Sequence, residues 1–205
     1  MKKIKIEVIH DVVCSWCPIG IKNIRTALET LDKQIEAEII YLPFELNPTM
    51  PSEGETIEAH LMRRNDWTKD QYLTYREGLI ETASKAGLIY DFNRRTHYYN
   101  TAKAHRLIHY AQNFNKQGAI VDALTEKYFT QGWNISETEK LLDIATSTGL
   151  DRKRAKQAIQ SDESIQQKYK RVSNITTGSV PAFIINKELI HGSNSVEFFI
   201  DFFNE

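Results

Sequence analysis

The sequence predicts an α/β fold in which one sheet-forming unit is interrupted by an all-helical insertion. Three observations lead to this expectation: a strand–helix–strand pattern at the start, a long middle segment with helical patterning, and a hairpin followed by a helix at the end. Neither end could bury its part of a sheet alone, so we expect the two ends to form one unit.

The first part of the chain shows a strand-like spacing of apolar residues, then a helical spacing, and then a strand-like spacing again. Residues 3–9 and 35–43 place apolar side chains at every second position, which is typical of strands. Between them, apolar residues recur at helical spacing over residues 18–32. A strand–helix–strand connection within one sheet is parallel and right-handed, so we expect the two strands to be parallel.

The segment from about 52 to 174 shows helical patterning and no good strand. Capping residues indicate where its helices begin, and glycines indicate where they end. The expected starts are Thr68 with Gln71, Ser136 with Glu139, and Asp151, and the expected ends are Gly87 and Gly149.

The end of the chain returns to a sheet pattern. Apolar runs at 181–185 and 189–191 flank a turn, which predicts a hairpin, and Asn194 with Glu197 then predicts the start of a final helix. The first and last pieces together have the content of one thioredoxin-like unit. The expected organisation is a thioredoxin-like domain over residues 1–50 and 175–205, with a helical insertion domain over residues 51–174.

Composition and charge exclude several classes of protein. The chain has 205 residues, of which 41% are hydrophobic and 26% charged, which is typical of a globular protein with its own core. A formal net charge of -1 gives no reason to expect a nucleic-acid or anionic membrane partner. Charged residues from Lys5 to Asp11 break the apolar run that an export signal needs, so we expect a cytoplasmic protein.

Cys14 and Cys17 are the strongest functional signal. They lie between the first strand and the first helix, and a pair so close together has little value as a structural disulfide. The free N–H groups and the dipole of a helix N-terminus favour a thiolate there. We expect Cys14 to be the partly exposed nucleophile and Cys17, one turn further in, to resolve the mixed disulfide.

Two short segments are candidates for substrate contact. Ser15 and Trp16 lie between the cysteines, and we expect Trp16 to be exposed. Within residues 177–183, Pro181 follows a glycine-containing turn and starts a strand, which makes it a candidate for a cis peptide. The backbone of Val180 could then pair with an extended substrate. A trans proline that starts an edge strand is the alternative.

Other interpretations of the cysteine pair stay open. The two cysteines could be inert buried residues, half of a zinc site, or a retained motif on a protein that only binds partners. Structural zinc needs about four ligands. The chain has no second cysteine pair, and His105 and His109 lie far along it, so we expect no metal site.

Several segments carry a resemblance to a known family. They are residues 11–20, 43–48 and 100–107, Tyr128-Phe129 with Gly132, and residues 180–183. In this order they resemble the DsbA-like thioredoxin superfamily and, within it, the cytoplasmic FrnE-like branch. The resemblance implies Cys14 as nucleophile, Cys17 as resolving thiol, Pro181 as the cis-proline, and helices that cover the active-site face.

The chain departs from the family pattern at two positions. Ser15 stands where proline is usual, which should change the shape of the helix mouth and shift the reduction potential, and Ser179 stands where glycine often occurs. Related 2-hydroxychromene-2-carboxylate isomerases and kappa-class glutathione transferases typically have serine where this chain has Cys14, and the cysteine pair argues against that branch.

Five further residues are candidates for supporting roles. The resemblance implies that Asn47, Asn100 and His105 lie near the cleft, although Asn47 also suits a turn and Asn100 a helix cap. His105 on a helix face is more often a structural partner than an acid or base. His10 and Asp11 could each tune the pKa of the first cysteine, and strand alternation turns them to opposite faces.

These observations predict a protein disulfide oxidoreductase or isomerase that exchanges disulfides with protein or small-molecule thiols. The cysteines are the redox centre, so we expect no bound cofactor. We expect glutathione to be the thiol that recycles them. The alternatives are a glutathione-dependent isomerase or transferase and a non-catalytic binding or chaperone-like module. The aromatic cluster over residues 198–203 is dense; packing on the sheet explains it simply, and a homodimer is the other explanation.

Overall fold

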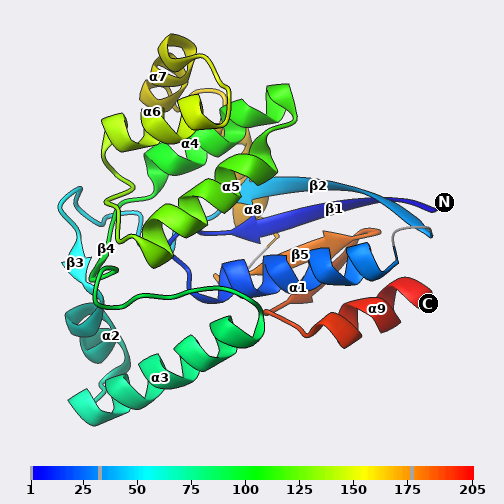
Figure 1. Ribbon diagram of the computed structural model, residues 1–205. Coiled ribbons are helices and arrows are strands. Elements are labelled where there is room, and N and C mark those ends of the chain that lie inside the picture. Colours follow the sequence, from blue (N-terminus) through cyan, green and yellow to red (C-terminus); the bar gives the residue numbers. More distant parts are fainter. Residues whose placement is uncertain (1, 32–33, 176–177) are drawn as a thin grey trace.

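A four-stranded sheet forms the centre of the structure. The computed structural model describes residues 2–31, 34–175 and 178–205. The strand order is β2-β1-β5-β6 (Figure 1). The strands are β1 (Lys2–His10), β2 (Ile35–Pro43), β5 (Ala182–Ile185) and β6 (Glu188–His191). β1 is parallel to β2 and antiparallel to β5, and β5 is antiparallel to β6, which confirms the expected strands and hairpin.

β1 occupies the middle of the sheet because its second half can be buried on both faces. Its exposed and buried positions alternate at first, and every residue from Glu7 to His10 is then buried. Val8 lies opposite Tyr41 of β2 and Phe183 of β5, so three large side chains share one face. The chain therefore leaves β1 in the interior, where the cysteine motif begins.

Helices cover both faces of the sheet. α1 (Trp16–Thr30) and α9 (Val196–Asn204) pack together on one face, and α8 (Gln166–Ser173) packs against β2 (Figure 1). Phe199 and Phe203 of α9 are buried, whereas Phe198 is 41% exposed. Much of the dense aromatic cluster is thus part of the core.

The segment between β2 and β5 is mainly helical, as expected. α4 and α5 pack against β2, and α2 and α3 lie beyond the C-terminal end of β1 (Figure 1). A 3-10 turn over Gln112–Phe114 follows α4, and a π-helical turn over Glu126–Thr130 follows α5. The α-helices before α8 are α2 (Ile57–Asn65), α3 (Lys69–Lys85), α4 (Ala102–Ala111), α5 (Gln117–Thr125), α6 (Thr138–Ser147) and α7 (Arg152–Gln160).

This segment also contains a strand pair, which the sequence analysis did not predict. β3 (Glu55–Thr56) pairs antiparallel with β4 (His97–Tyr98). Strands of two residues are too short to show an alternating pattern.

The first helix begins at Trp16 and not at residue 18, and the expected last residue, Asp32, lies outside the described residues.

Two of the expected helix starts are confirmed. Thr68 and Gln71 form the expected capping box of α3, and the Asp151 side chain accepts a hydrogen bond from the Arg154 N–H of α7. The two expected glycine stops are also confirmed. α3 ends just before Gly87 and α6 just before Gly149, because both glycines have positive φ.

The other two expected helix starts are wrong by one residue. Ser136 does not cap α6, because its hydroxyl donates to the Ser52 carbonyl at 2.7 Å. Ser195 caps α9, whereas the Asn194 side chain donates to the His191 carbonyl at 3.0 Å. At α9 the neighbouring Ser195 offers similar chemistry and replaces Asn194, whereas Glu137 at the start of α6 makes no side-chain cap hydrogen bond.

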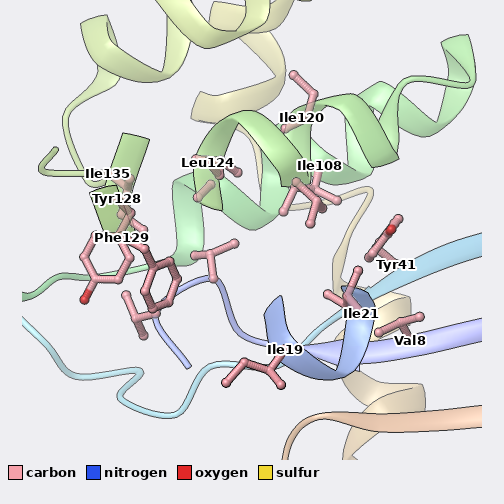
Figure 2. Close-up of a cluster of buried hydrophobic side chains, with 14 of the residues drawn as sticks. Val8, Ile19, Ile21, Tyr41, Ile108, Ile120, Leu124, Tyr128, Phe129 and Ile135 are labelled. Atoms are coloured by element: carbon pink, nitrogen blue, oxygen red, sulfur yellow. The ribbon is translucent and has the colours of Figure 1, made fainter. Parts of the chain in front are cut away.

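One apolar core joins the sheet to the helical segment. In Figure 2, Ile21 of α1 and Tyr41 of β2 lie beneath Ile108 of α4 and Ile120 of α5. These side chains belong to one buried cluster. We therefore expect the sheet and the helical segment to unfold together.

Replacing Leu124 by alanine tests this shared core. Leu124 of α5 is 1% exposed (Figure 2), so we expect the variant to lose about 2–5 kcal/mol of unfolding free energy. Calorimetry should show one transition at a lower temperature. As a control, Ile89→Ala at a site that is 70% exposed should change stability by less than about 0.5 kcal/mol. Two separate transitions, only one of them shifted, would contradict the shared core.

Candidate active site

The two cysteines lie in the turn that joins β1 to α1. The Cys14 N–H donates to the Asp11 carbonyl at 3.1 Å, and the Cys17 N–H donates to the Cys14 carbonyl at 3.2 Å. Both are free thiols, with exposed fractions of 6% for Cys14 and 1% for Cys17. Cys17 is the deeper of the two, as expected, but the expectation that Cys14 is partly exposed was wrong.

The Cys17 thiol resists ionisation. Burial raises the pKa of the Cys17 thiol well above its usual range, and its hydrogen bond to Cys14 and the charge of Cys14 raise it further. A backbone hydrogen bond from Asp11 opposes this rise in pKa without overcoming it. Cys17 is therefore held as a neutral thiol.

The loop before β5 lies against Cys14. The Val180 carbonyl oxygen lies 3.5 Å from Cys14 Sγ. Trp16 is half-buried and packs against the same apolar core as Tyr75 of α3, so the expectation of an exposed side chain was wrong. Sequence patterns within α1 could not reveal this burial, because it depends on packing against residues far along the chain.

The loop before β5 is fitted closely against α1. The Val180–Pro181 peptide bond is cis. A Cβ atom at Gly20 would lie 3.1 Å from Pro181 Cγ, so a larger residue there would push the helix and the loop apart. The Pro181 carbonyl also accepts a hydrogen bond from the Gly192 N–H at 2.9 Å. Thr177, at the start of the motif, lies outside the described residues.

Asp11 and His105 form a buried polar pair beside the cysteine turn. Their exposed fractions are 0% and 1%. His105 Nε2 lies 3.2 Å from Asp11 Oδ1 and 2.9 Å from the Phe44 carbonyl, so Nε2 carries the proton between two acceptors. The Leu46 N–H donates to Asp11 Oδ2 at 2.8 Å. The carboxylate is thus held from both sides, which fixes the start of the cysteine turn.

His10 is buried as well, so both residues before the cysteine turn face the interior. Its ring makes edge contacts with Tyr41 and His105, at centroid distances of 5.3 Å and 5.6 Å. Burial lowers the pKa of His10 well below its usual value, and the charges of His105 and Arg25 lower it further. His10 is therefore neutral in the folded protein.

Asn100 fastens the loop after β2 to the start of α4. The Asn100 side chain donates to the Met50 carbonyl at 3.0 Å and accepts from the Ala102 N–H at 3.1 Å. The Asn47 carbonyl accepts from the Met50 N–H at 3.0 Å, which closes the turn that the sequence suggested. The N-cap of α4 is Thr101, so Asn100 binds the first helical N–H from one residue before the cap.

Two residues that hold the cysteine turn were not predicted from the sequence. Arg95 is 1% exposed, and its Nη2 donates to the Val13 carbonyl at 3.0 Å. The Tyr90 hydroxyl donates to the Ser15 carbonyl at 2.7 Å. Both contacts join main-chain oxygens to a segment far along the chain. No local pattern separates Arg95 from a solvated arginine, so only the tertiary structure could identify it.

The described ranges hold neither a candidate metal site nor a membrane-spanning helix. No group of three or more His, Cys, Asp or Glu side chains there could hold a metal ion. No helix in the same part of the chain is long and apolar enough to cross a membrane.

A Cys-x-x-Cys turn at the start of the first helix, facing the loop before β5, defines a thioredoxin-fold protein of the DsbA-like class. The chain belongs to the family described as the DSBA-like thioredoxin domain, which matches residues 5–204. This family contains DsbA-like thiol–disulfide oxidoreductases. The expected fold, a thioredoxin fold interrupted by a helical insertion, is confirmed.

Individual relatives agree with this assignment. The uncharacterized protein YwbO of Bacillus subtilis (strain 168) is 26% identical over 203 residues, which cover 96% of this chain and 94% of YwbO. The probable DsbA oxidoreductase SCO1869 of Streptomyces coelicolor has a TM-score of 0.89 at 21% identity, covering 97% of this chain and 87% of its own. The cytosolic disulfide reductase DsbM of Pseudomonas aeruginosa, with GSH, has a TM-score of 0.65 at 13% identity, covering 98% and 97%.

The neutral His10 predicts a loss of stability in mild acid. Its pKa is lowered in the folded state, so the unfolded state binds the extra proton as the pH falls below about 6.5. This proton uptake should remove up to about 1.4 kcal/mol of unfolding free energy per pH unit. His10→Gln should flatten the pH dependence in urea titrations, and His191→Gln, at an exposed site, should leave it unchanged. Equal slopes for all three proteins would contradict the neutral His10.

Proposed function

We propose that this protein catalyses dithiol–disulfide exchange through Cys14 and Cys17 on protein or small-molecule substrates. The observation that carries the proposal is the placement of both thiols in the turn at the start of α1, with Cys17 the deeper of the two and its pKa raised by burial. Cys17 stays protonated and unreactive while Cys14, at the start of α1, is the thiol that attacks. The two residues thus have separate roles before any substrate binds.

The reaction proceeds in two exchanges. The Cys14 thiolate attacks one sulfur of a substrate disulfide, forms a mixed disulfide and releases the other sulfur as a thiolate. Cys17 then gives up its proton and attacks Cys14 Sγ, which forms the Cys14–Cys17 disulfide and releases the second substrate thiolate. The substrate gains two electrons and the cysteine pair loses two. The reverse sequence oxidises a dithiol substrate.

Residues beside the cysteines are proposed to contact the substrate. In the free protein, Cys14 Sγ lies within hydrogen-bond distance of the Val180 carbonyl. When Cys14 reacts, this oxygen becomes an acceptor for a substrate N–H, as in strand addition. Ser15, Trp16 and Pro181 border the same place and complete the proposed contact surface.

Asp11 and His105 are proposed as positioning residues rather than reactive groups. His105 holds Asp11 at 3.2 Å, and the Asp11 main chain provides both the turn before Cys14 and the hydrogen bond to Cys17. A change at His105 therefore acts on the thiols through Asp11.

The proposal requires no bound cofactor, because the cysteine pair itself stores two electrons. Glutathione is the proposed recycling thiol and the cytoplasm the proposed location; the likeness to DsbM, named as cytosolic and described with GSH, supports both. A homodimer is not part of the proposal, since Phe198 is the one residue of the α9 aromatic cluster with a substantially exposed side chain in the described structure.

Single cysteine replacements test the mechanism. With glutathione disulfide as substrate, mass spectrometry should show an internal disulfide in the unmodified protein. Cys17→Ser should instead accumulate a stable mixed disulfide with glutathione at Cys14, because the resolving thiol is missing. Cys14→Ser should react no faster than an exposed model thiol. Thermal melting of each variant controls for folding.

The alternatives predict different results. Exchange activity that survives in Cys14→Ser would contradict the proposal, and a complete lack of exchange in the unmodified protein would favour a binding module. A glutathione-dependent isomerisation or transfer that is unaffected by Cys17→Ser would favour the isomerase and transferase branch.

A further inference from the structure

A cavity of about 420 Å³ lies on the sheet face opposite α1 and α9. Side chains alternate along a strand, so Ile6 and Val8 of β1 face the core beneath α1, whereas Glu7 faces the other way. On this second face α8 packs against β2, and the cavity opens beside α8, over β1 and the β5–β6 hairpin. Neither cysteine lines the cavity, so it is distinct from the site of thiol exchange.

The floor of the cavity is apolar and accessible. Glu7 of β1, Ile184 of β5 and Leu189 of β6 lie in one row across the sheet. Ile175, just after α8, adds a third aliphatic side chain. All three aliphatic side chains are half-buried, because they border the smaller apolar cluster of the protein. An apolar group can therefore cover them without a change in the fold.

The rim of the cavity carries more positive than negative charge. Its charged residues are Lys5, Arg171, Lys187 and Glu7. Glu7 is already neutralised, because Arg171 donates to both of its carboxylate oxygens and Lys5 Nζ lies 3.4 Å away. Lys187 is exposed and has no carboxylate partner among the described residues. The Lys5 side chain is 57% exposed, so both amines are open to an incoming anion.

Lys187 has a backbone conformation that residues with side chains rarely adopt. Asn186 and Lys187 are the two central residues of the turn between β5 and β6, with φ angles of 51° and 73°. Asparagine followed by glycine is usual in such a turn, because a side chain strains the left-handed region. Stability alone does not explain a lysine at the second position, whereas a role for its amine at the cavity does.

We propose that this cavity binds a small aliphatic carboxylate. The carboxylate pairs with the amines of Lys187 and Lys5, and the aliphatic body packs on Ile175, Ile184 and Leu189. The body is essential to the proposal, because amines that are exposed to water gain little from an anion alone. The proposal does not rest on the thiol chemistry.

Titration calorimetry with octanoate, octanamide and butanoate tests the proposal on the full chain. Octanoate should bind at one site, and its affinity should fall as salt is added, because both amines are exposed. Octanamide, which lacks the charge, should bind at least about 3-fold more weakly. Butanoate, which lacks four of the methylene groups, should bind at least about 10-fold more weakly.

Replacing Lys187 by glycine separates a role in binding from a role in the fold. Lys187→Gly should weaken octanoate binding about 3-fold to 5-fold, because one ion pair is lost. It should not lower the melting temperature, because glycine suits the left-handed turn. Lys156→Gln, at an exposed position of α7 that does not line the cavity, should change neither quantity. A lysine that served only the fold would give a lower melting temperature and an unchanged affinity.

Three results would overturn the proposal. They are an absence of saturable octanoate binding, equal affinity for octanoate and octanamide, and unchanged octanoate affinity in Lys187→Gly. Equal affinity for butanoate would overturn the assignment of an aliphatic body.

Discussion

The burial of the C-terminal end of β1 is the constraint on which the rest of the structure depends. β1 lies between β2 and β5, so the chain enters the cysteine turn inside the protein. Polar groups in that turn need partners that water would otherwise supply. The helical segment supplies them: His105 holds Asp11, and Arg95 holds the Val13 carbonyl. The insertion therefore completes the active-site turn as well as covering it.

The same burial separates the two thiols chemically. Cys17 lies deeper and keeps its proton, whereas Cys14 meets the Val180 carbonyl at the edge of the buried region. Because Cys14 is 6% exposed, a substrate reaches it only when the residues that cover it move. We expect a small disulfide to reach Cys14 with less movement of that cover than a folded protein would need.

The parts of the fold that the sequence predicted are those with a local cause. Alternation identified β1 and β2, and capping residues and glycines located the starts of α3 and α7 and the ends of α3 and α6, because each signal acts within a few residues. Asn194 failed as a cap because Ser195 offers the same chemistry next to it. β3 and β4 were missed because two residues cannot show a period.

The local motif of the site was predicted from the sequence, whereas its tertiary contacts were not. The Cys14–Cys17 motif is local and was found from sequence. The burial of Cys14 and Trp16 depends on tertiary packing, and the role of Arg95 depends on a fold that brings it to Val13. Those features have no pattern in the chain, since the partners are far apart in sequence.

Equilibrium redox titration of the cysteine pair tests the central claim most directly. The protein is equilibrated in buffers of graded reduced-to-oxidised glutathione ratio, and the free thiols are then alkylated and counted by mass spectrometry. The account predicts one cooperative two-electron transition between the dithiol and the Cys14–Cys17 disulfide. If no intramolecular disulfide forms at any ratio, the cysteines are not a redox pair and the account is wrong.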